Sequence, residues 1–397
     1  MKTAGIICEY NPFHNGHLYQ INKTKEAGAE GIIAIMSGNF VQRGDLSIAP
    51  KSAKAQMAVD AGVDLVLELP TPWAMSCAED FSNGAISVLK ATGVCDMLSF
   101  GSECGDLEKL KIAAKAVKDS QVEEKLNIYL KDGISFAAAR SKAICEVYSK
   151  EIEDIISSPN DILGVEYINA VENTEIEPLI IKRDIPHDKE SDDPFLKSAC
   201  EIREMIFKKD SSFKSALPFS SFEIIRQYSS FGQCPVSVNN LEQAVLAVLR
   251  KMKPEDFLNL PDVSEGLENR LYTAIMQSSS LKEVLLRGKS KRYTMARIRR
   301  IILNAYLGIE KGISKAEVPY IRVLAIGKNG KELLREMKQK AAKPIITTYS
   351  DVKKENEFCQ RVFEIESTCS DLYSLSFSKI TPCATEKTSS IYINDKE

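Results

Sequence analysis

Short runs of apolar residues alternate with helix-like stretches over roughly the first hundred residues of this 397-residue chain. The apolar runs are residues 5–8, 31–36, 64–69 and 94–100, and the stretches between them are residues 16–29, 51–61 and 78–91. Apolar runs of this length without polar alternation are typical of parallel strands that are buried on both faces. Their alternation with helices predicts an α/β fold with a doubly wound parallel sheet.

The pattern changes in character at about residue 210. Between about residue 105 and that point the pattern is mostly helical, with a fifth strand predicted over residues 179–182. After it, helical apolar spacing and polar connectors with Pro and Gly predict a mostly α-helical domain over residues 211–310. Residues 311–397 predict a small α/β appendage, and we expect its polar tail from about Thr381 to be flexible. The predicted domains are therefore residues 1–210, 211–310 and 311–397.

Composition and charge narrow the classes of protein that this chain can be. Hydrophobic residues make up 44% and charged residues 27% of the sequence, as in a globular protein. The net charge of −3 gives no general attraction to nucleic acid, so RNA binding would need a local basic patch. The ten cysteines are scattered without metal-ligand spacing, and no metal site is expected on the protein. Without a leader peptide or a membrane-length apolar run, the chain is expected to be cytoplasmic and not to bind a membrane.

Two of the three histidines, His14 and His17, lie close together just after the first apolar run, in the sequence NPFHNGH. In a βα unit this loop opens at the carboxyl edge of the sheet, where ligands of such folds bind. The first N–H groups of the following helix are unpaired there and attract phosphate. Histidines at i and i+3 lie on one helical face. We interpret HNGH as an HxGH signature, in which both imidazoles stabilise charge during attack at an α-phosphorus and Gly16 leaves room for the nucleotide.

Other polar residues follow predicted strands or begin predicted helices at the same edge. Gln42 and Arg43, in a glycine-bounded segment, are candidates for holding a substrate carboxylate or a phosphate, unless the segment is a flexible surface loop. Arg183 follows the fifth strand and is a candidate phosphate ligand. Ser198 and Arg203 loosely fit the form S-[ST]-x-x-[IV]-R, which binds β and γ phosphates in nucleotidyltransferases. A surface cation on a helix is the alternative for Arg203.

Residues 287–300 form the clearest basic patch of the chain, with seven basic residues and no acid. Backbone phosphates of RNA would account for such a cluster, and an aromatic ring within it could stack on a base. A solvated basic helix is the alternative. The candidate tRNA-binding residues are Lys289, Lys291, Arg292, Tyr293, Arg297, Arg299 and Arg300.

Six motifs, in this order and at these spacings, resemble those of the tRNA(Met) cytidine acetate ligase family, a bacterial relative of the HIGH-type nucleotidyltransferases. The motifs are EYNPFHNGH, MSGNFVQRG, DLVLELP, FGSE, SSPNDILGVEY and KRYTMARIRR. The resemblance covers roughly residues 1–310, whereas the remaining residues match only in general character. Ser198 to Arg203 reproduces the phosphate motif of the family only in part.

The resemblance implies an enzyme that activates acetate with ATP as acetyl-adenylate and transfers the acetyl group to N4 of the wobble cytidine of elongator tRNA(Met). Residues 1–210 would be the nucleotidyltransferase-like ATP-binding catalytic domain and residues 211–310 the tRNA-binding domain. Mg²⁺ is expected to arrive with ATP. The ATP-binding residues that the resemblance implies are Ile7, Cys8, Glu9, Tyr10, Asn11, Pro12, Phe13, His14, Asn15, Gly16, His17, Leu18, Tyr19, Gln20, Gly101, Asn160 and Arg183.

Two other functions share part of this pattern. A nucleotidyltransferase that adenylates a phosphorylated small molecule would keep the HNGH sequence but would not need a basic helical domain. A noncatalytic RNA-binding protein would keep the basic patch and would need neither His14 nor His17.

Overall fold

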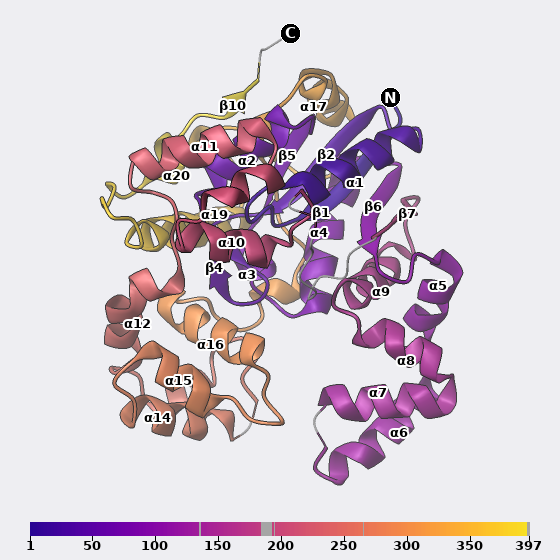
Figure 1. The fold of residues 1–397 in the computed structure, drawn as a ribbon, viewed down its shortest axis with the longest axis vertical. Coiled ribbons are helices and arrows are strands. Elements are labelled where there is room, and N and C mark those ends of the chain that lie inside the picture. Colours follow the sequence, from indigo (N-terminus) through magenta and orange to yellow (C-terminus); the bar gives the residue numbers. More distant parts are fainter. Residues whose placement is uncertain (135, 184–192, 194, 265, 395–397) are drawn as a thin grey trace.

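The computed structural model describes residues 1–134, 136–183, 193, 195–264 and 266–394. In this part of the chain, eight strands form one sheet in the order β10-β8-β5-β2-β1-β6-β7, with β9 paired to β8 (Figure 1). The strands are β1 (Thr3–Cys8), β2 (Gly31–Ser37), β5 (Leu65–Leu69), β6 (Met97–Ser102), β7 (Glu177–Lys182), β8 (Ile321–Ile326), β9 (Ile345–Ile346) and β10 (Tyr392–Ile393). A two-stranded hairpin, β3 (Phe40–Val41) and β4 (Asp45–Leu46), lies apart from it.

The central strands confirm the prediction of an α/β fold with a mostly parallel sheet. Strands β5, β2, β1, β6 and β7 pair in parallel, with Thr3 of β1 opposite Gly31 of β2. Because β2 and β5 lie on one side of β1 while β6 and β7 lie on the other, the strand order reverses between β1 and β6. Ligands of doubly wound sheets bind in the crevice at this reversal.

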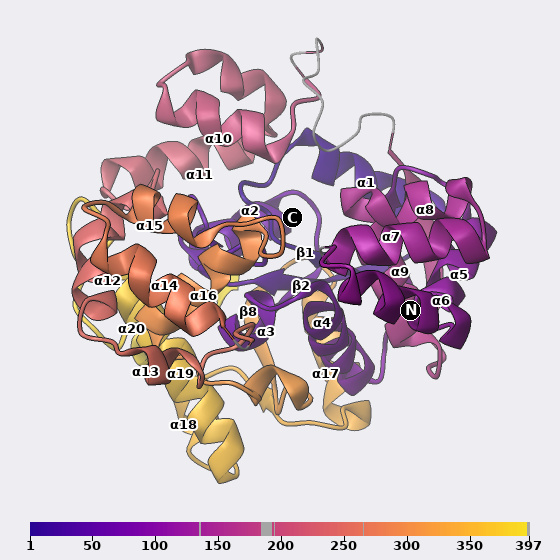
Figure 2. The same ribbon diagram turned by 90° about the horizontal axis from the view of Figure 1, so that it is seen from below.

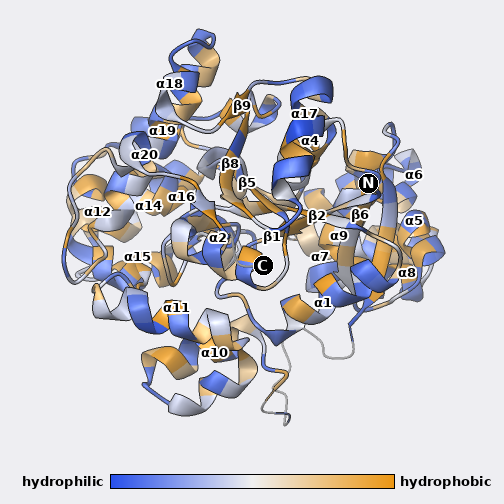
Figure 3. Ribbon diagram, turned by 90° about the horizontal axis from the view of Figure 1, so that it is seen from above, coloured by the Kyte–Doolittle hydropathy of each residue, from blue (hydrophilic) through white to orange (hydrophobic). Residues whose placement is uncertain are grey.

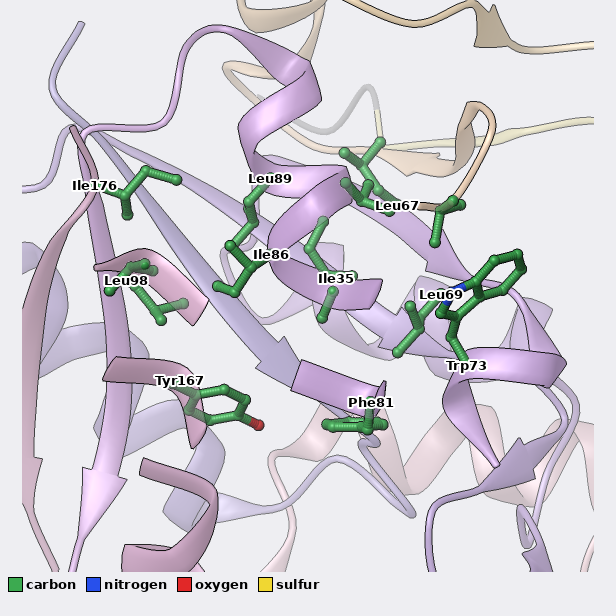
Figure 4. Close-up of a cluster of buried hydrophobic side chains, with 14 of the residues drawn as sticks. Ile35, Leu67, Leu69, Trp73, Phe81, Ile86, Leu89, Leu98, Tyr167 and Ile176 are labelled. Carbon is green, nitrogen blue, oxygen red and sulfur yellow. The ribbon is translucent and has the colours of Figure 1, made fainter. Parts of the chain in front are cut away.

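Helices cover both faces of the sheet, and the alternation of side chains along the strands decides which face each residue joins. Ile33 and Ile35 face one core cluster with α4, whereas Ile32 and Ala34 face a second cluster with α1 and α2. Figure 4 shows the first cluster, in which Ile35 and residues of α4 pack together. The helices of this part are α1 (Asn15–Glu26), α2 (Lys51–Asp60), α3 (Thr71–Ala74), α4 (Ala78–Thr92), α5 (Leu107–Ala116), α6 (Ser120–Lys131), α7 (Phe136–Val147), α8 (Lys150–Ser157), α9 (Pro159–Val171) and α10 (Ala199–Phe207).

The helices predicted after residue 210 are present; the first packs through Ile224 and Ile225 in the second cluster beside α2, and the later ones share a core of their own. They include α11 (Phe219–Ser230), α12 (Glu242–Leu249), α13 (Pro254–Phe257), α14 (Leu267–Met276), α15 (Leu281–Gly288) and α16 (Met295–Leu307). Helices α12 and α14 to α16 lie together on one side of the molecule (Figure 2). Phe40 and Leu46 of the β3–β4 hairpin are buried in their core. The segment considered as a flexible loop is therefore an ordered hairpin.

The α/β elements predicted after residue 310 are present, but their strands extend the main sheet and do not form a separate appendage. Strand β8 pairs antiparallel with β5, and β10 pairs with β8. Helices α17 (Gly330–Lys340), α18 (Tyr349–Val352) and α19 (Glu357–Ser374) follow in this region. Strand β8 covers the edge of β5, which would otherwise leave a row of unpaired backbone groups.

The tail expected to be disordered is ordered through residue 394, since it contains α20 (Thr385–Thr388) and β10. Buried charges hold it in place. The carboxylate of Glu386 lies 2.8 Å from Lys51 Nζ and also pairs with Arg322. Lys51 Nζ pairs further with Glu68 at 2.5 Å and with Glu366 at 2.9 Å. This network joins the C-terminal segment to the sheet although the tail has little apolar surface.

Hydropathy follows the same layers, because the central strands are hydrophobic and the outer helices present hydrophilic residues (Figure 3). None of the helices in the described ranges has the length and apolar character that crossing a bilayer requires.

Candidate active site

The HNGH sequence forms the start of α1, and its two histidines cap the helix reciprocally. The Gly16 N–H donates to His14 Nδ1 at 3.0 Å, and the His14 N–H donates to His17 Nδ1 at 3.2 Å. The two ring centroids lie 3.8 Å apart. Because each Nδ1 accepts a hydrogen bond, a neutral imidazole must carry its proton on Nε2. When either ring is neutral, its donor hydrogen is therefore on Nε2.

The surroundings of His17 keep its ring neutral. Burial lowers the pKa of His17 well below its ordinary value, and the nearby His14 and Arg183 lower the pKa further. The ring rests on Tyr10 and Phe13, with centroids 4.8 Å and 5.5 Å away. Since these two aromatic side chains are fully buried, they fix the orientation of His17.

Gly16 has a role within the loop itself. A Cβ atom at this position would lie 2.8 Å from His14 Cε1 and 3.0 Å from His14 Nδ1. Because carbon atoms do not approach so closely, any other residue would displace the His14 ring. The expected role was to leave room for the nucleotide, and the structure adds that Gly16 leaves room for His14.

A cleft opens between the start of α1, the ends of β6 and β7, and the start of α10. It is lined by His14, Gly16, His17, Tyr19, Gln20, Gly101, Ile181, Lys182, Arg183, Leu196, Lys197 and Ser198. Among these lining residues three are basic and none is acidic. The N-termini of α1 and α10 both meet the cleft, and helix N-termini favour anions. The cleft at the reversal of the sheet therefore suits a polyphosphate.

Gly101 and Arg183 meet across the paired strands β6 and β7. A Cβ on Gly101 would lie 3.1 Å from Arg183 Cδ, so the glycine allows the arginine to cross the end of β6. Burial lowers the pKa of Arg183, and the nearby Glu103 carboxylate raises it. Asn160 lies in the first turn of α9, where its side-chain amide donates to Glu103. Glu103 is thus shared by Asn160 and Arg183, and Asn160 does not line the cleft.

Ser198 and Arg203 have different positions relative to the cleft. Ser198 lines it and caps α10, since its Oγ accepts from the Glu201 N–H at 3.2 Å. Arg203 is not among the lining residues, because its Nη1 donates to the Asn11 carbonyl at 2.8 Å. In this conformation Arg203 supports the loop after β1 and does not face the cleft.

The predicted ATP-binding stretch 7–20 divides into lining and supporting residues. His14, Gly16, His17, Tyr19 and Gln20 line the cleft. The remaining residues of the stretch are Ile7, Cys8, Glu9, Tyr10, Asn11, Pro12, Phe13, Asn15 and Leu18, and none of these lines it.

Two of these supporting residues hold neighbouring segments in place. Asn15 Nδ2 donates to the carbonyls of Phe195 and Ser215 at 3.0 Å and 2.9 Å. Asn11 Oδ1 accepts from the Ile48 N–H at 2.7 Å. These bonds attach the motif loop to the segment before α10 and to the chain after β4.

Gln42 and Arg43 lie in the turn of the β3–β4 hairpin and outside the cleft. The Gln42 N–H donates to Glu9 Oε1 at 2.9 Å, and Arg43 is exposed.

Sequence reasoning overlooked Lys182 and Lys197, which line the cleft. Their signal was position, since Lys182 ends β7 and Lys197 directly precedes the cap of α10.

The basic patch 287–300 divides into internal and exposed side chains. Arg300 is 8% exposed and pairs with Asp262 at 2.6 Å. Arg297 donates to the Asp262 carbonyl at 2.8 Å and to Ser264 Oγ at 3.1 Å. Arg299 reaches Asp45 of the hairpin at 4.0 Å. Arg297 and Arg300 are therefore bonded within the protein, whereas Arg299 forms an ion pair at the surface with its side chain 41% exposed.

Tyr293 is 7% exposed, with the guanidinium groups of Arg292 and Arg297 5.6 Å and 5.3 Å from its ring centroid. This burial argues against the expected stacking of Tyr293 on a base. Lys289, Lys291 and Arg292 are exposed and have no ion pair with any residue that the structure describes. Together with Arg287, which is also exposed, they belong to the part of the patch that an anionic partner can reach.

Comparisons with known proteins agree with this geometry. The HIGH Nucleotidyl Transferase family matches residues 1–388. The tRNA(Met) cytidine acetate ligase of Thermoanaerobacter sp. (strain X514) is 40% identical over 388 residues, which cover 95% of this chain and 96% of that protein. That of Caldicellulosiruptor bescii is 39% identical over 411 residues and covers 100% of both.

Two solved structures share the fold. The crystal structure of apo Thermotoga maritima TmcAL has a TM-score of 0.94 and 32% identity, and covers 99% of both chains. The crystal structure of Thermotoga maritima TmcAL bound with alpha-thio ATP has a TM-score of 0.93 and the same 32% identity, and also covers 99% of both chains.

Proposed function

Because the chain belongs to the tRNA(Met) cytidine acetate ligase family and is an ATP-dependent ligase, we propose that it forms acetyl-adenylate in this cleft. The N4 amine of the wobble cytidine of elongator tRNA(Met) would then attack the acetyl carbonyl, forming the amide and releasing AMP and a proton. The carrying observation is the paired imidazoles at the reversal of the sheet, beside basic side chains and two helix N-termini. The three phosphate groups of ATP carry several negative charges, and binding them in one cleft requires hydrogen-bond donors and positive charge of this kind.

The tautomers of the two histidines define their proposed work. Their Nε2–H groups would donate to oxygens of the α-phosphate, where charge builds up as an acetate oxygen attacks the phosphorus. A neutral His17 suits this task because its lowered pKa keeps the ring in one protonation state across physiological pH. Lys182, Arg183, Lys197 and the start of α10 would hold the pyrophosphate that leaves.

Of the remaining predicted ATP contacts, two line the cleft and one lies behind its lining residues. Gly101 and Ser198 line the cleft with the histidines. Asn160 would act next to them through Glu103. Mg²⁺ would arrive with the phosphates, since the lining residues include no carboxylate to ligate it.

We infer that tRNA reaches the cleft from the helical region of residues 211–310, which carries the exposed cations of the basic patch. The catalytic region would comprise residues 1–210 together with the strands that residues 311–394 add to the sheet. A cytoplasmic location follows from the proposed substrates, tRNA and ATP.

Acetate-dependent exchange of labelled pyrophosphate into ATP, with and without tRNA, tests the proposal. We expect exchange that requires acetate and does not require tRNA. Exchange that requires a phosphorylated metabolite would support the small-molecule nucleotidyltransferase. Bound tRNA without any exchange would support the noncatalytic RNA-binding protein.

A further inference from the structure

The β3–β4 hairpin joins the two regions that the proposed reaction needs. It follows β2 along the chain but is not part of the main sheet. Its residues Phe40 and Leu46 are buried in the core cluster that includes α12 and α14 to α16. Its backbone therefore belongs to the core of the helical region and cannot move independently of it.

One contact attaches the hairpin turn to the motif loop. The Gln42 N–H donates to Glu9 Oε1 at 2.9 Å, and Glu9 directly follows β1. Lys54, which is fully buried, donates from Nζ to the Glu9 carbonyl and to the Ser37 carbonyl, both at 2.8 Å. The segments that follow β1 and β2 are thus fixed to each other beside the candidate active site.

A second contact attaches the turn to the basic patch. Gly44 has a φ of +72°, and a Cβ there would lie 2.5 Å from the backbone nitrogen of Arg300. Asp45 lies 4.0 Å from Arg299. The turn therefore presses directly on the first half of α16.

Arg43 stands between these two attachments and is exposed. It has no hydrogen bond or ion pair with any residue in the described ranges. Burial or pairing would offset the entropy of holding a long side chain, and neither is present here. A cation held on a rigid turn between the motif loop and α16 is placed to meet an anion that spans both.

We propose that Arg43 binds a backbone phosphate of the RNA substrate close to the nucleotide that is modified. This inference rests on the proposed function. Arg43 would add a cation beside the motif loop and α16 to those exposed at Lys289, Lys291 and Arg292, and would hold the RNA strand as the reactive base enters.

The acetate ion is the competing ligand for Arg43, and the geometry disfavours it. Acetate must contact the α-phosphorus to attack it, whereas Arg43 does not line the cleft that contains His14 and His17. A reactive acyl-adenylate also needs shelter from water, which an exposed guanidinium does not provide. The polyanionic RNA backbone tolerates solvent and meets exposed cations in this way.

The test compares Arg43→Ala, Arg43→Lys and the control Arg335→Ala in the full-length protein. Arg335 is exposed on α17, on the side of the molecule away from α16 (Figure 1). Two reactions are measured: acetate-dependent pyrophosphate exchange without tRNA, and acetyl transfer to tRNA over a range of tRNA and salt concentrations.

For Arg43→Ala we expect unchanged exchange, a KM for tRNA that rises about tenfold, and a salt slope that is smaller by about 0.7 to 1. Arg43→Lys should recover part of the affinity, since it keeps the charge, and Arg335→Ala should match the wild type. A loss of exchange in Arg43→Ala would overturn the proposal and assign the residue to acetate or ATP. Wild-type transfer at every tRNA concentration would overturn it too. Absence of exchange in the wild type would instead contradict the proposed function.

Discussion

The cleft and the basic patch 287–300 contain the same kinds of side chain, yet they use them in opposite ways. In the cleft, the Nδ1 atoms of His14 and His17 accept hydrogen bonds from the backbone of their own motif. In the patch, Arg297 and Arg300 bond to Asp262, which lies more than thirty residues away in sequence. A sequence pattern therefore indicates an anion-binding site most reliably where the hydrogen-bond partners of its side chains belong to the same motif.

The consequence for the patch is a smaller binding surface than its composition suggests. Four of its seven basic residues, Arg287, Lys289, Lys291 and Arg292, remain exposed. Arg270 holds the chain that carries them, because its guanidinium donates to the carbonyls of Arg287, Gly288 and Lys289 at 2.7–2.8 Å. The hydrogen bonds of Arg270 to these backbone carbonyls thus support the segment that carries the exposed cations.

Replacing His17 with Ala would show whether the cleft is catalytic, and it should have the largest effect. Loss of one preorganised donor is expected to slow pyrophosphate exchange by about a hundredfold to a thousandfold. The lost helix cap should cost roughly 1 kcal/mol of unfolding free energy, which is too little to unfold the protein. Affinity for tRNA, measured in parallel, should not change. Exchange at the wild-type rate would remove His17 from the mechanism.

Replacing Arg300 with Ala would test the opposite assignment in the patch. The carboxylate of Asp262 would lose its partner in a mostly buried place, and we expect the free energy of unfolding to fall by about 1–3 kcal/mol. Denaturant unfolding measures this loss. A double-mutant cycle with Asp262→Ala should return a favourable coupling energy. If Arg300→Ala weakened tRNA binding at unchanged stability, the side chain would belong to the RNA surface.

Much of the sheet was predictable because its signals are local. The runs that contain Ile6 and Ile33 are apolar throughout and that of Leu67 is mostly apolar, and all three side chains are buried in parallel strands. The C-terminal strand over residues 320–326 was also predicted, but its place beside β5 was not. Apolar spacing identifies a strand, whereas its neighbour depends on packing between distant segments.

The missed features share this dependence on distant partners. Phe40 and Leu46 look like loop residues until the helices that bury them are present. The tail is ordered because Glu386 meets Lys51 and Arg322, and no local pattern signals that meeting. In the site, the two histidines were predicted from their spacing, whereas Lys197 was missed because only the tertiary fold brings the start of α10 to the cleft.

Protonation of His17 offers a further difference between the two regions, because this ring titrates at moderate pH in the unfolded chain and stays neutral in the folded cleft. The pKa of His17 is lowered in the folded protein, while in the unfolded chain it is about 6.5. The unfolded chain therefore binds more protons than the folded protein below about pH 6.5. As the pH decreases, the contribution of this group should lower the free energy of unfolding by at most about 1.4 kcal/mol per pH unit. Denaturant unfolding of wild type and His17→Gln between pH 7 and 5.5 would isolate the effect. Parallel pH profiles for the two proteins would contradict it.

The double variant Lys291→Ala and Arg292→Ala tests the exposed part of the basic patch, and it should have the smallest effect of these substitutions. Both side chains are exposed, so the free energy of unfolding should stay within about 0.5 kcal/mol of the wild type. Affinity for tRNA should fall severalfold at low salt, and the salt slope should decrease by roughly 0.7 to 0.9 for each lost phosphate contact. Pyrophosphate exchange should continue at the wild-type rate, because neither residue lines the cleft. Arg297→Ala is the matched control, in which stability should fall because the contacts with Asp262 and Ser264 are lost. If the double variant bound tRNA with an unchanged salt slope, the exposed cations would not be the RNA surface, and the route of tRNA to the cleft would have to lie elsewhere.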